Sequence, residues 1–120
     1  MKDLTKPFGS SMGTSKYYQH FTKIVLYTDG IKDMADTLKC HWLIDLIASY
    51  QITQKFKDIA YQIWKFTAKD SKCVAECFGY SDIAVAEQKI PFTTLPDGEI
   101  VVVAVWQDEK TMIVALPIEG

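Results

Sequence analysis

The residues of this chain that could carry out covalent or acid–base chemistry are few, and cysteine and histidine come first. Cys40 is followed directly by His41, the residue types of a nucleophile and its general base. Adjacent residues of a helix point about 100° apart, so these two do not form such a pair by themselves. His20 stands in an aromatic segment, where packing or hydrogen bonding is the expected role. An enzyme that depends on His20 or His41 is therefore the least supported of three functional hypotheses, after a protein-binding module and a small-ligand-binding domain.

The remaining cysteines raise the question of zinc. Cys73 and Cys77, together with Cys40 and His41, have the right ligand types. If Cys73 and Cys77 lie in one strand, their Cα atoms are about 13 Å apart at ~3.3 Å per residue. Two thiolates at that separation cannot both lie about 2.3 Å from one ion. We therefore expect buried thiols, no metal and no cofactor.

Asp45 and Ser49 form an unusual polar pair, spaced i, i+4 in an otherwise apolar helical segment. A buried carboxylate needs a hydrogen-bonding partner, so the structural interpretation ties Asp45 to a nearby amide or hydroxyl. The functional alternative is a pocket between helix and sheet that binds a small ligand. Its lining would be Trp42, Asp45, Ser49 and Tyr61.

Three acidic residues, Asp29, Asp33 and Asp36, recur at i, i+4, i+7. Lys32 and Lys39 can each pair with Asp36, so much of this stripe is a solvated face that compensates its own charge. The functional alternative is an acidic surface that binds the basic groove of a partner protein. The candidate partner-binding residues are these three aspartates and the aromatic residues Tyr17, Tyr18 and Phe21.

Composition limits the classes of partner. The 120 residues have the length of one domain, and the net charge is -2. All thirteen basic residues are lysine, so no arginine is present for bidentate contacts to phosphate or guanine. Specific reading of nucleic acid is therefore not expected. No apolar run approaches the roughly 18 residues of a membrane span, and the start of the chain is no secretory signal. With an odd number of cysteines, we expect a cytoplasmic protein without disulfides and without a membrane partner.

Residues 1–13 are rich in glycine, serine and proline and lack a hydrophobic period. They are predicted to form a flexible N-terminal arm that docks through Leu4 and Phe8, and residues 14–120 a single domain. Within residues 14–26, Tyr17, Phe21 and either Ile24 or Val25 follow the i, i+4, i+7 spacing, which favours a short helix.

A second helical region starts at residue 28 or 29, where Thr28 or Asp29 provides the N-cap. The apolar positions then recur at helical spacing and place Trp42 in the core. A break near Lys39 and Cys40 divides this region into one bent helix or two short ones. The apolar stripe consists of Ile31, Met34, Leu38, Trp42 and Ile47.

Beyond residue 53 the hydrophobic period changes from 3.6 to 2, which indicates strands. Strands are predicted over residues 59–67, 73–78, 83–90, 99–106 and 111–116. The fold class is therefore α+β, with N-terminal helices packed on a four- or five-stranded antiparallel sheet. The strand over 99–106 is apolar on both faces. Helices and the arm cover both faces in one interpretation, and another protein chain covers one face in the alternative.

Five short segments of the chain suggest a family: Tyr17-Tyr18, YTDG at 27–30, WLID at 42–45, IAS at 47–49 and QIWK at 62–65. From about Tyr17 onward the chain resembles a family of small uncharacterised proteins of bacteria, phages and plasmids, described as a domain of unknown function. The resemblance implies a small α+β domain carried by mobile elements, with no known substrate.

From this we expect a non-enzymatic protein-binding module. In its most concrete form it inhibits a host defence effector that processes nucleic acid, as an anti-CRISPR protein does, by occluding a binding surface. The sequence leaves the oligomeric state open.

Overall fold

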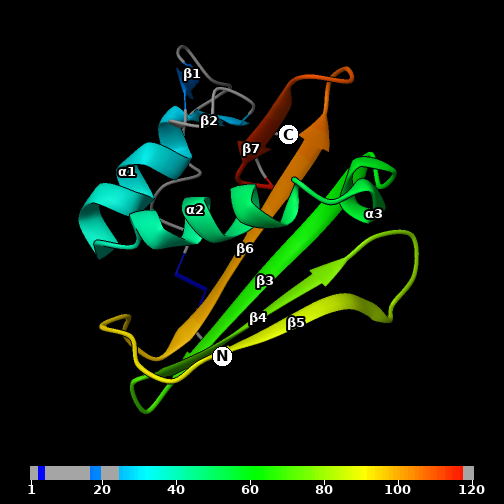
Figure 1. Ribbon diagram of the computed structural model, residues 1–120. Coiled ribbons are helices and arrows are strands. Elements are labelled where there is room, and N and C mark those ends of the chain that lie inside the picture. Colours follow the sequence, from blue (N-terminus) through cyan, green and yellow to red (C-terminus); the bar gives the residue numbers. More distant parts are fainter. Residues whose placement is uncertain (1–2, 5–16, 20–24, 118–120) are drawn as a thin grey trace.

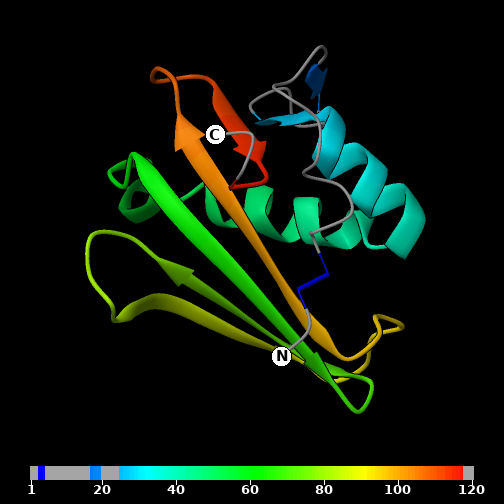
Figure 2. The same cartoon turned by 180° about the vertical axis from the view of Figure 1, so that it is seen from behind.

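Seven strands of the described residues form one mixed sheet, and the helices α1 and α2 pack on one of its faces (Figure 1). The computed structural model describes residues 3–4, 17–19 and 25–117. The strands are β1 (Tyr17–Gln19), β2 (Val25–Thr28), β3 (Tyr61–Lys69), β4 (Lys72–Phe78), β5 (Ala84–Ile90), β6 (Gly98–Trp106) and β7 (Met112–Ala115). The helices are α1 (Asp29–Leu38), α2 (His41–Tyr50) and α3 (Gln54–Lys57). Seen from behind, β6 crosses in front of α2 (Figure 2).

The α+β class is confirmed, but the predicted sheet and helix order were wrong. The strand order is β1-β2-β7-β6-β3-β4-β5, in which β2 and β7 are parallel and all other neighbours antiparallel. The five predicted strands all form, as β3 to β7, and the helices lie between β2 and β3 and not at the N-terminus. The described elements make up a single compact domain.

The predicted helix within residues 14–26 was also wrong, because β1 and β2 occupy its described part. Val25 is buried and pairs with Met112 of β7. This long-range pairing buries apolar surface that a short helix at this position would leave exposed, so tertiary context overrides the local spacing. Phe21 and Ile24 lie outside the described residues.

The start and end of α1 follow the sequence signals. The Oγ1 atom of Thr28 accepts a hydrogen bond from the amide of Ile31 at 3.4 Å, which makes Thr28 the N-cap. Asp29 lies in the first turn, where the helix dipole favours negative charge. The predicted break is confirmed: α1 ends at Leu38, and Lys39 has the left-handed φ of 54° that closes many helices.

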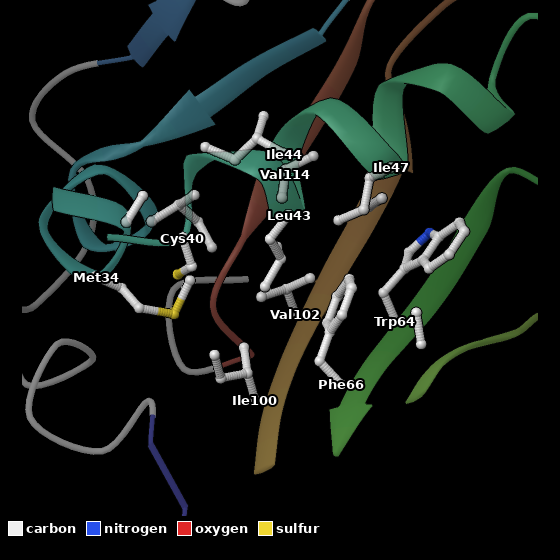
Figure 3. Close-up of a cluster of buried hydrophobic side chains, with 14 of the residues drawn as sticks. Met34, Cys40, Leu43, Ile44, Ile47, Trp64, Phe66, Ile100, Val102 and Val114 are labelled. Carbon is white, nitrogen blue, oxygen red and sulfur yellow. The ribbon is translucent and has the colours of Figure 1, made fainter. Parts of the chain in front are cut away.

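The core lies between the helices and one face of the sheet, here called the helix face. Along β3, buried side chains alternate with more exposed ones, and Trp64 and Phe66 are the largest that point toward the helices. Leu43 and Ile47 of α2 pack over them and over Val102 of β6 (Figure 3).

On β6, helix coverage is confirmed for one face only. Ile100 and Val102 are fully buried on the helix face, whereas Val101 and Val105 on the outer face are half-buried. Val103 of that outer face is 5% exposed.

A buried pair of amides connects the end of α2 to β3. The Gln51 Nε2 atom donates to Gln62 Oε1 at 2.8 Å, and Gln62 Nε2 donates back to Gln51 Oε1 at 2.9 Å. Trp64 Nε1 donates to the same Gln62 Oε1 at 3.0 Å, and Gln62 Nε2 also reaches the carbonyl of Phe56 at 3.0 Å. Both glutamines are at most 2% exposed, so these bonds fix α2 against the sheet.

Of the predicted N-terminal arm, the structure describes Asp3 and Leu4. Leu4 is buried in the core, and its amide donates to the carbonyl of Glu99 at 2.8 Å. The predicted contact through Leu4 is therefore confirmed, while Phe8 lies outside the described residues.

Candidate functional site

A groove of about 450 Å³ runs between α2 and the end of β5. One wall consists of Trp42, Asp45, Leu46 and Ser49 of α2, and the other of Gln88, Ile90 and Phe92. Phe92 is 69% exposed, whereas Ile90 packs partly against the core. The groove therefore presents apolar side chains to solvent next to a carboxylate, a hydroxyl and an amide.

The spacing of the α2 residues explains why they share this wall. Positions 42, 45, 46 and 49 recur at i, i+3, i+4, i+7 and lie on one helix face. The neighbouring stripe, Leu43, Ile44, Ile47 and Ala48, is buried against the sheet. The hydroxyl of Tyr50 donates to Gln88 Oε1 at 3.0 Å and ties the two walls together.

Three of the four residues predicted to line a pocket meet in this groove, and Tyr61 does not. Tyr61 begins β3 on the outer face of the sheet, one position from the buried Gln62, and is 47% exposed there. Successive residues of a strand point to opposite faces, so Tyr61 cannot reach a groove on the helix face.

The expected burial of Asp45 was wrong, because this side chain is exposed. Ser49 is also exposed, and its hydroxyl donates to the carbonyl of Leu46 at 2.7 Å. Trp42 is half-buried: its ring meets that of Phe66 edge-on, with centroids 6.1 Å apart, while it also lines the groove. The fully buried tryptophan is Trp64, at 1% exposure.

Sequence reasoning missed the β5 wall of the groove. Ile90 and Phe92 flank Pro91, and two apolar side chains around a proline at a strand end were the available signal. Their position opposite α2 depends on β5 being the last strand of the sheet, which local patterns do not show.

The predicted acidic surface forms on α1, beside β1. Asp33 and Asp36 are exposed and Asp29 is half-exposed. The predicted pair of Lys32 and Asp36 is confirmed, with Nζ and Oδ2 2.6 Å apart. His41, and not Lys39, is the second partner, since its Nε2 lies 2.7 Å from Asp36 Oδ1. The hydrogen bond from Lys32, and then that from His41, lowers the pKa of Asp36.

Aromatic residues of β1 adjoin this acidic surface. The Lys32 Nζ atom lies 5.3 Å from the centre of the Tyr18 ring, a cation–π contact. Tyr18 also stacks on Tyr27, and Tyr17 is 55% exposed. Phe21, the third predicted aromatic residue, lies outside the described residues.

A larger hollow of about 570 Å³ lies between α3 and the turn that joins β6 and β7. Its lining carries charges of both signs on exposed residues, Lys57, Asp58, Asp108 and Glu109, with Gln54 and the single aromatic Trp106. The Trp106 Nε1 atom already donates to the carbonyl of Phe56 at 3.3 Å. The smaller groove therefore has the stronger combination of apolar surface and polar groups.

The thiols are not in a state for catalysis. Burial raises the pKa of Cys40 to about 11 and that of Cys77 to about 12, and it also raises the pKa of Cys73. A thiol with such a pKa is protonated near neutral pH and is a poor nucleophile. Cys73 and Cys77 lie on the same strand, β4, as the zinc argument assumed. His41 pairs with Asp36 at the surface, while His20 lies outside the described residues.

Within residues 3–4, 17–19 and 25–117, no three His, Cys, Asp or Glu side chains are grouped as metal ligands. None of the helices there is long and apolar enough to span a membrane.

Comparison with known proteins places the chain in a family. Residues 2–119 match the model of a family of unknown function, DUF6876, so the chain belongs to that family. Neither a curated protein nor a solved structure was found to match the chain.

Proposed function

We propose that this member of the DUF6876 family is a non-enzymatic protein-binding module whose main contact surface is the groove between α2 and β5. The observation that supports this most is that the exposed Phe92 and the half-buried Trp42 line opposite walls of that groove. Aromatic side chains that are accessible yet held by a rigid scaffold are typical anchors of protein interfaces. Asp45, Ser49 and Gln88 would supply the polar contacts around these anchors.

A protein partner fits this groove better than a small molecule does. Small-ligand sites commonly bury about 70–90% of their ligand. Phe92 is 69% exposed, so one wall of the groove stands largely in solvent and encloses little. A protein surface can cover such a wall, whereas a small molecule would leave much of it exposed to solvent.

The most concrete form of the proposal is an inhibitor of a host defence effector, of the anti-CRISPR type, that acts by occlusion. Exposed carboxylates at Asp33, Asp36 and Asp45 lie on α1 and α2, which pack on the same face of the sheet (Figure 1). Effectors that process nucleic acid carry basic grooves for the phosphate backbone. Carboxylates on the helices would steer the domain toward such a groove and fix its orientation.

The test starts with an affinity pull-down from a host lysate, with identification of the retained protein by mass spectrometry. Binding of the purified partner is then measured for Phe92→Ala and for the control Ile52→Ala, which removes a side chain 73% exposed and outside the groove. We expect Phe92→Ala to weaken the affinity by about tenfold or more and Ile52→Ala to leave it unchanged. Equal affinities of Phe92→Ala and the parent would remove the groove from the interface.

Charge reversal separates the contribution of the acidic surface. A variant with Asp29, Asp33 and Asp36 all changed to Lys should associate more slowly with a basic partner, and the difference should shrink at high salt. Association rates at two ionic strengths measure this. His41→Ala should retain binding, because no reaction depends on its imidazole. Unchanged association of the triple variant at both salts would leave the aromatic residues Tyr17, Tyr18 and Phe21 as the remaining predicted contacts outside the groove.

Binding of a small ligand in the same groove is the second candidate. It is favoured by the convergence of Asp45, Ser49 and Gln88 beside the Trp42 ring. A ligand screen by thermal shift distinguishes it: compounds that stabilise the parent and not Asp45→Ala would support this function.

A further inference from the structure

Among the strands of the described residues, β5 is the last of the sheet and pairs with β4 alone. Its residues Glu87, Gln88 and Lys89 are exposed, so its outer edge is open to another strand. Charged residues on an edge strand ordinarily discourage such pairing. Here the charges have opposite sign and stand two positions apart, on the same face of the strand.

Symmetry limits how two copies of β5 could pair. A two-fold axis relates most homodimers, and two antiparallel copies of one strand place it perpendicular to the sheet. The axis then passes through a single residue, since opposite residues must share a face. An axis at Glu87 or at Lys89 would set two like charges against each other. An axis at Gln88 instead places Glu87 of each copy opposite Lys89 of the other.

The same register suits the side chains on the groove side. There, the small Ala86 of one copy faces the larger Ile90 of the other, and the two Gln88 amides meet at the axis. On the outer face, Glu87 lies opposite Glu76 of its own β4, a repulsive cross-strand pair. Lys89 of the second copy would lie on the other side of Glu87 and offset that repulsion.

The ends of the strand fit this register too. At one end, Val85 is the extra residue of a β-bulge, since Cys77 pairs with Ala86 and Phe78 with Ala84. At the other end, Pro91 has no N–H to donate. The carbonyl of Val85 already accepts a hydrogen bond from Lys55 Nζ at 3.0 Å and needs no partner. A ladder centred on Gln88 therefore covers residues 86–90 and ends before the bulge at one end and before the proline at the other.

Beyond the ladder, the register brings exposed apolar residues together. Ile83 precedes β5 in the chain and is 77% exposed, and Phe92 follows β5 and is 69% exposed. The regular register ends at Ala86, because Val85 is the extra residue of a β-bulge. Beyond it, the antiparallel arrangement brings the end of β5 that carries Ile83 toward the end of the second copy that carries Phe92. Pairing would therefore remove apolar surface from water at two places related by the two-fold axis.

We infer that a second copy of this chain pairs antiparallel along β5, centred on Gln88, and forms a continuous sheet of two copies. Because the axis is perpendicular to the sheet, both α2 helices lie on the same face. The groove of each copy is then floored by both β5 strands, and Ile90 of the second copy joins its lining. This inference is independent of the proposed binding partner.

Sedimentation velocity of the full chain over a range of concentrations tests the inference. The parent should show a monomer–dimer equilibrium. Lys89→Glu should weaken dimerisation about tenfold or more, because both ion pairs become like-charge contacts. The double variant Glu87→Lys/Lys89→Glu restores opposite charges across the axis and should recover most of the parent's affinity. Lys110→Glu, an exposed change in the turn between β6 and β7, is the matched control and should behave as the parent does.

Each contrary outcome would overturn the inference. If the parent remains a monomer at every concentration, the proposed dimer does not form. If circular dichroism shows that Lys89→Glu is folded and this variant still dimerises as the parent does, the dimer forms through another surface. A double variant that stays monomeric rejects the register centred on Gln88.

Discussion

Replacing Gln62 with leucine should be among the most destabilising single changes that leave the core volume nearly unchanged. Gln62 is fully buried, and its amide bonds Gln51, the indole N–H of Trp64 and the carbonyl of Phe56. Leucine fills the space but offers no hydrogen bond. The variant therefore tests whether α2 is held by this polar network or by apolar packing alone.

The expected magnitude follows from the groups left without partners. In Gln62→Leu, the Trp64 N–H loses its acceptor, and the Gln51 amide keeps only its bond to the carbonyl of Ile47 at 3.1 Å. Each buried polar group left unsatisfied costs about 1–3 kcal/mol. The leucine regains roughly 1 kcal/mol by apolar burial. We expect the free energy of unfolding to fall by about 2–4 kcal/mol, a large part of the stability of a small domain.

Urea unfolding followed by tryptophan fluorescence measures this loss, with Gln51→Leu and the double variant completing a thermodynamic cycle. Removing both amides leaves fewer orphaned groups than removing one, so the double variant should be more stable than the sum of the single losses predicts, by about 1 kcal/mol or more. A Gln62→Leu variant within about 0.5 kcal/mol of the parent would refute the reasoning. Strictly additive losses would show that the two amides are not coupled.

Three further predictions follow from burial and charge. Trp64→Ala should cost about 3–5 kcal/mol in urea unfolding and Trp42→Ala roughly half as much, and equal losses would contradict the half-buried position of Trp42. Cys40 and Cys77 should resist iodoacetamide at pH 8 until denaturant is added, because their thiols are buried and protonated, and rapid labelling of the native chain would contradict this. The pKa of Asp36 is lowered in the folded chain, so its contribution to stability is present above the unfolded pKa and is lost as pH falls through the folded one. Asp36→Asn should therefore reduce the loss of stability between neutral and acidic pH, and an unchanged slope in unfolding midpoints would refute it.

Local signals in the sequence predicted the parts of the fold that depend on local physics. The Thr28 cap and the break at Lys39 each depend on a few neighbouring residues. Period-2 alternation likewise found the five strands β3 to β7, because their pairing partners lie mostly next to them in sequence.

The errors concern contacts between distant segments. Val25 forms a strand because Met112 of β7 offers it a parallel partner, more than 80 positions further along the chain. No spacing within residues 14–26 carries that information. Asp45 was expected to be buried because its neighbours on α2 are apolar, but burial depends on what faces the helix. The sheet lies under Leu43 and Ile47, whereas Asp45 and Ser49 face the groove.

The position of β5 at the end of the sheet explains both of the surfaces proposed for binding. The stripe of Leu43, Ile44, Ile47 and Ala48 is fully used against the core, and α2 turns its next stripe toward Gln88, Ile90 and Phe92. No described strand lies beyond β5 to extend the floor of the groove, so Phe92 stays in solvent and the backbone edge stays open. Apolar surface and an unpaired edge at the same place are costly to leave uncovered, and a single small domain has no further element to cover them. A partner protein in the groove and a second copy along the edge would both approach Phe92, which lines the groove and lies near Ile83 of the second copy in the proposed pair. Lys89 is not part of the groove lining, so Lys89→Glu should weaken the association of two copies and leave binding of the partner unchanged.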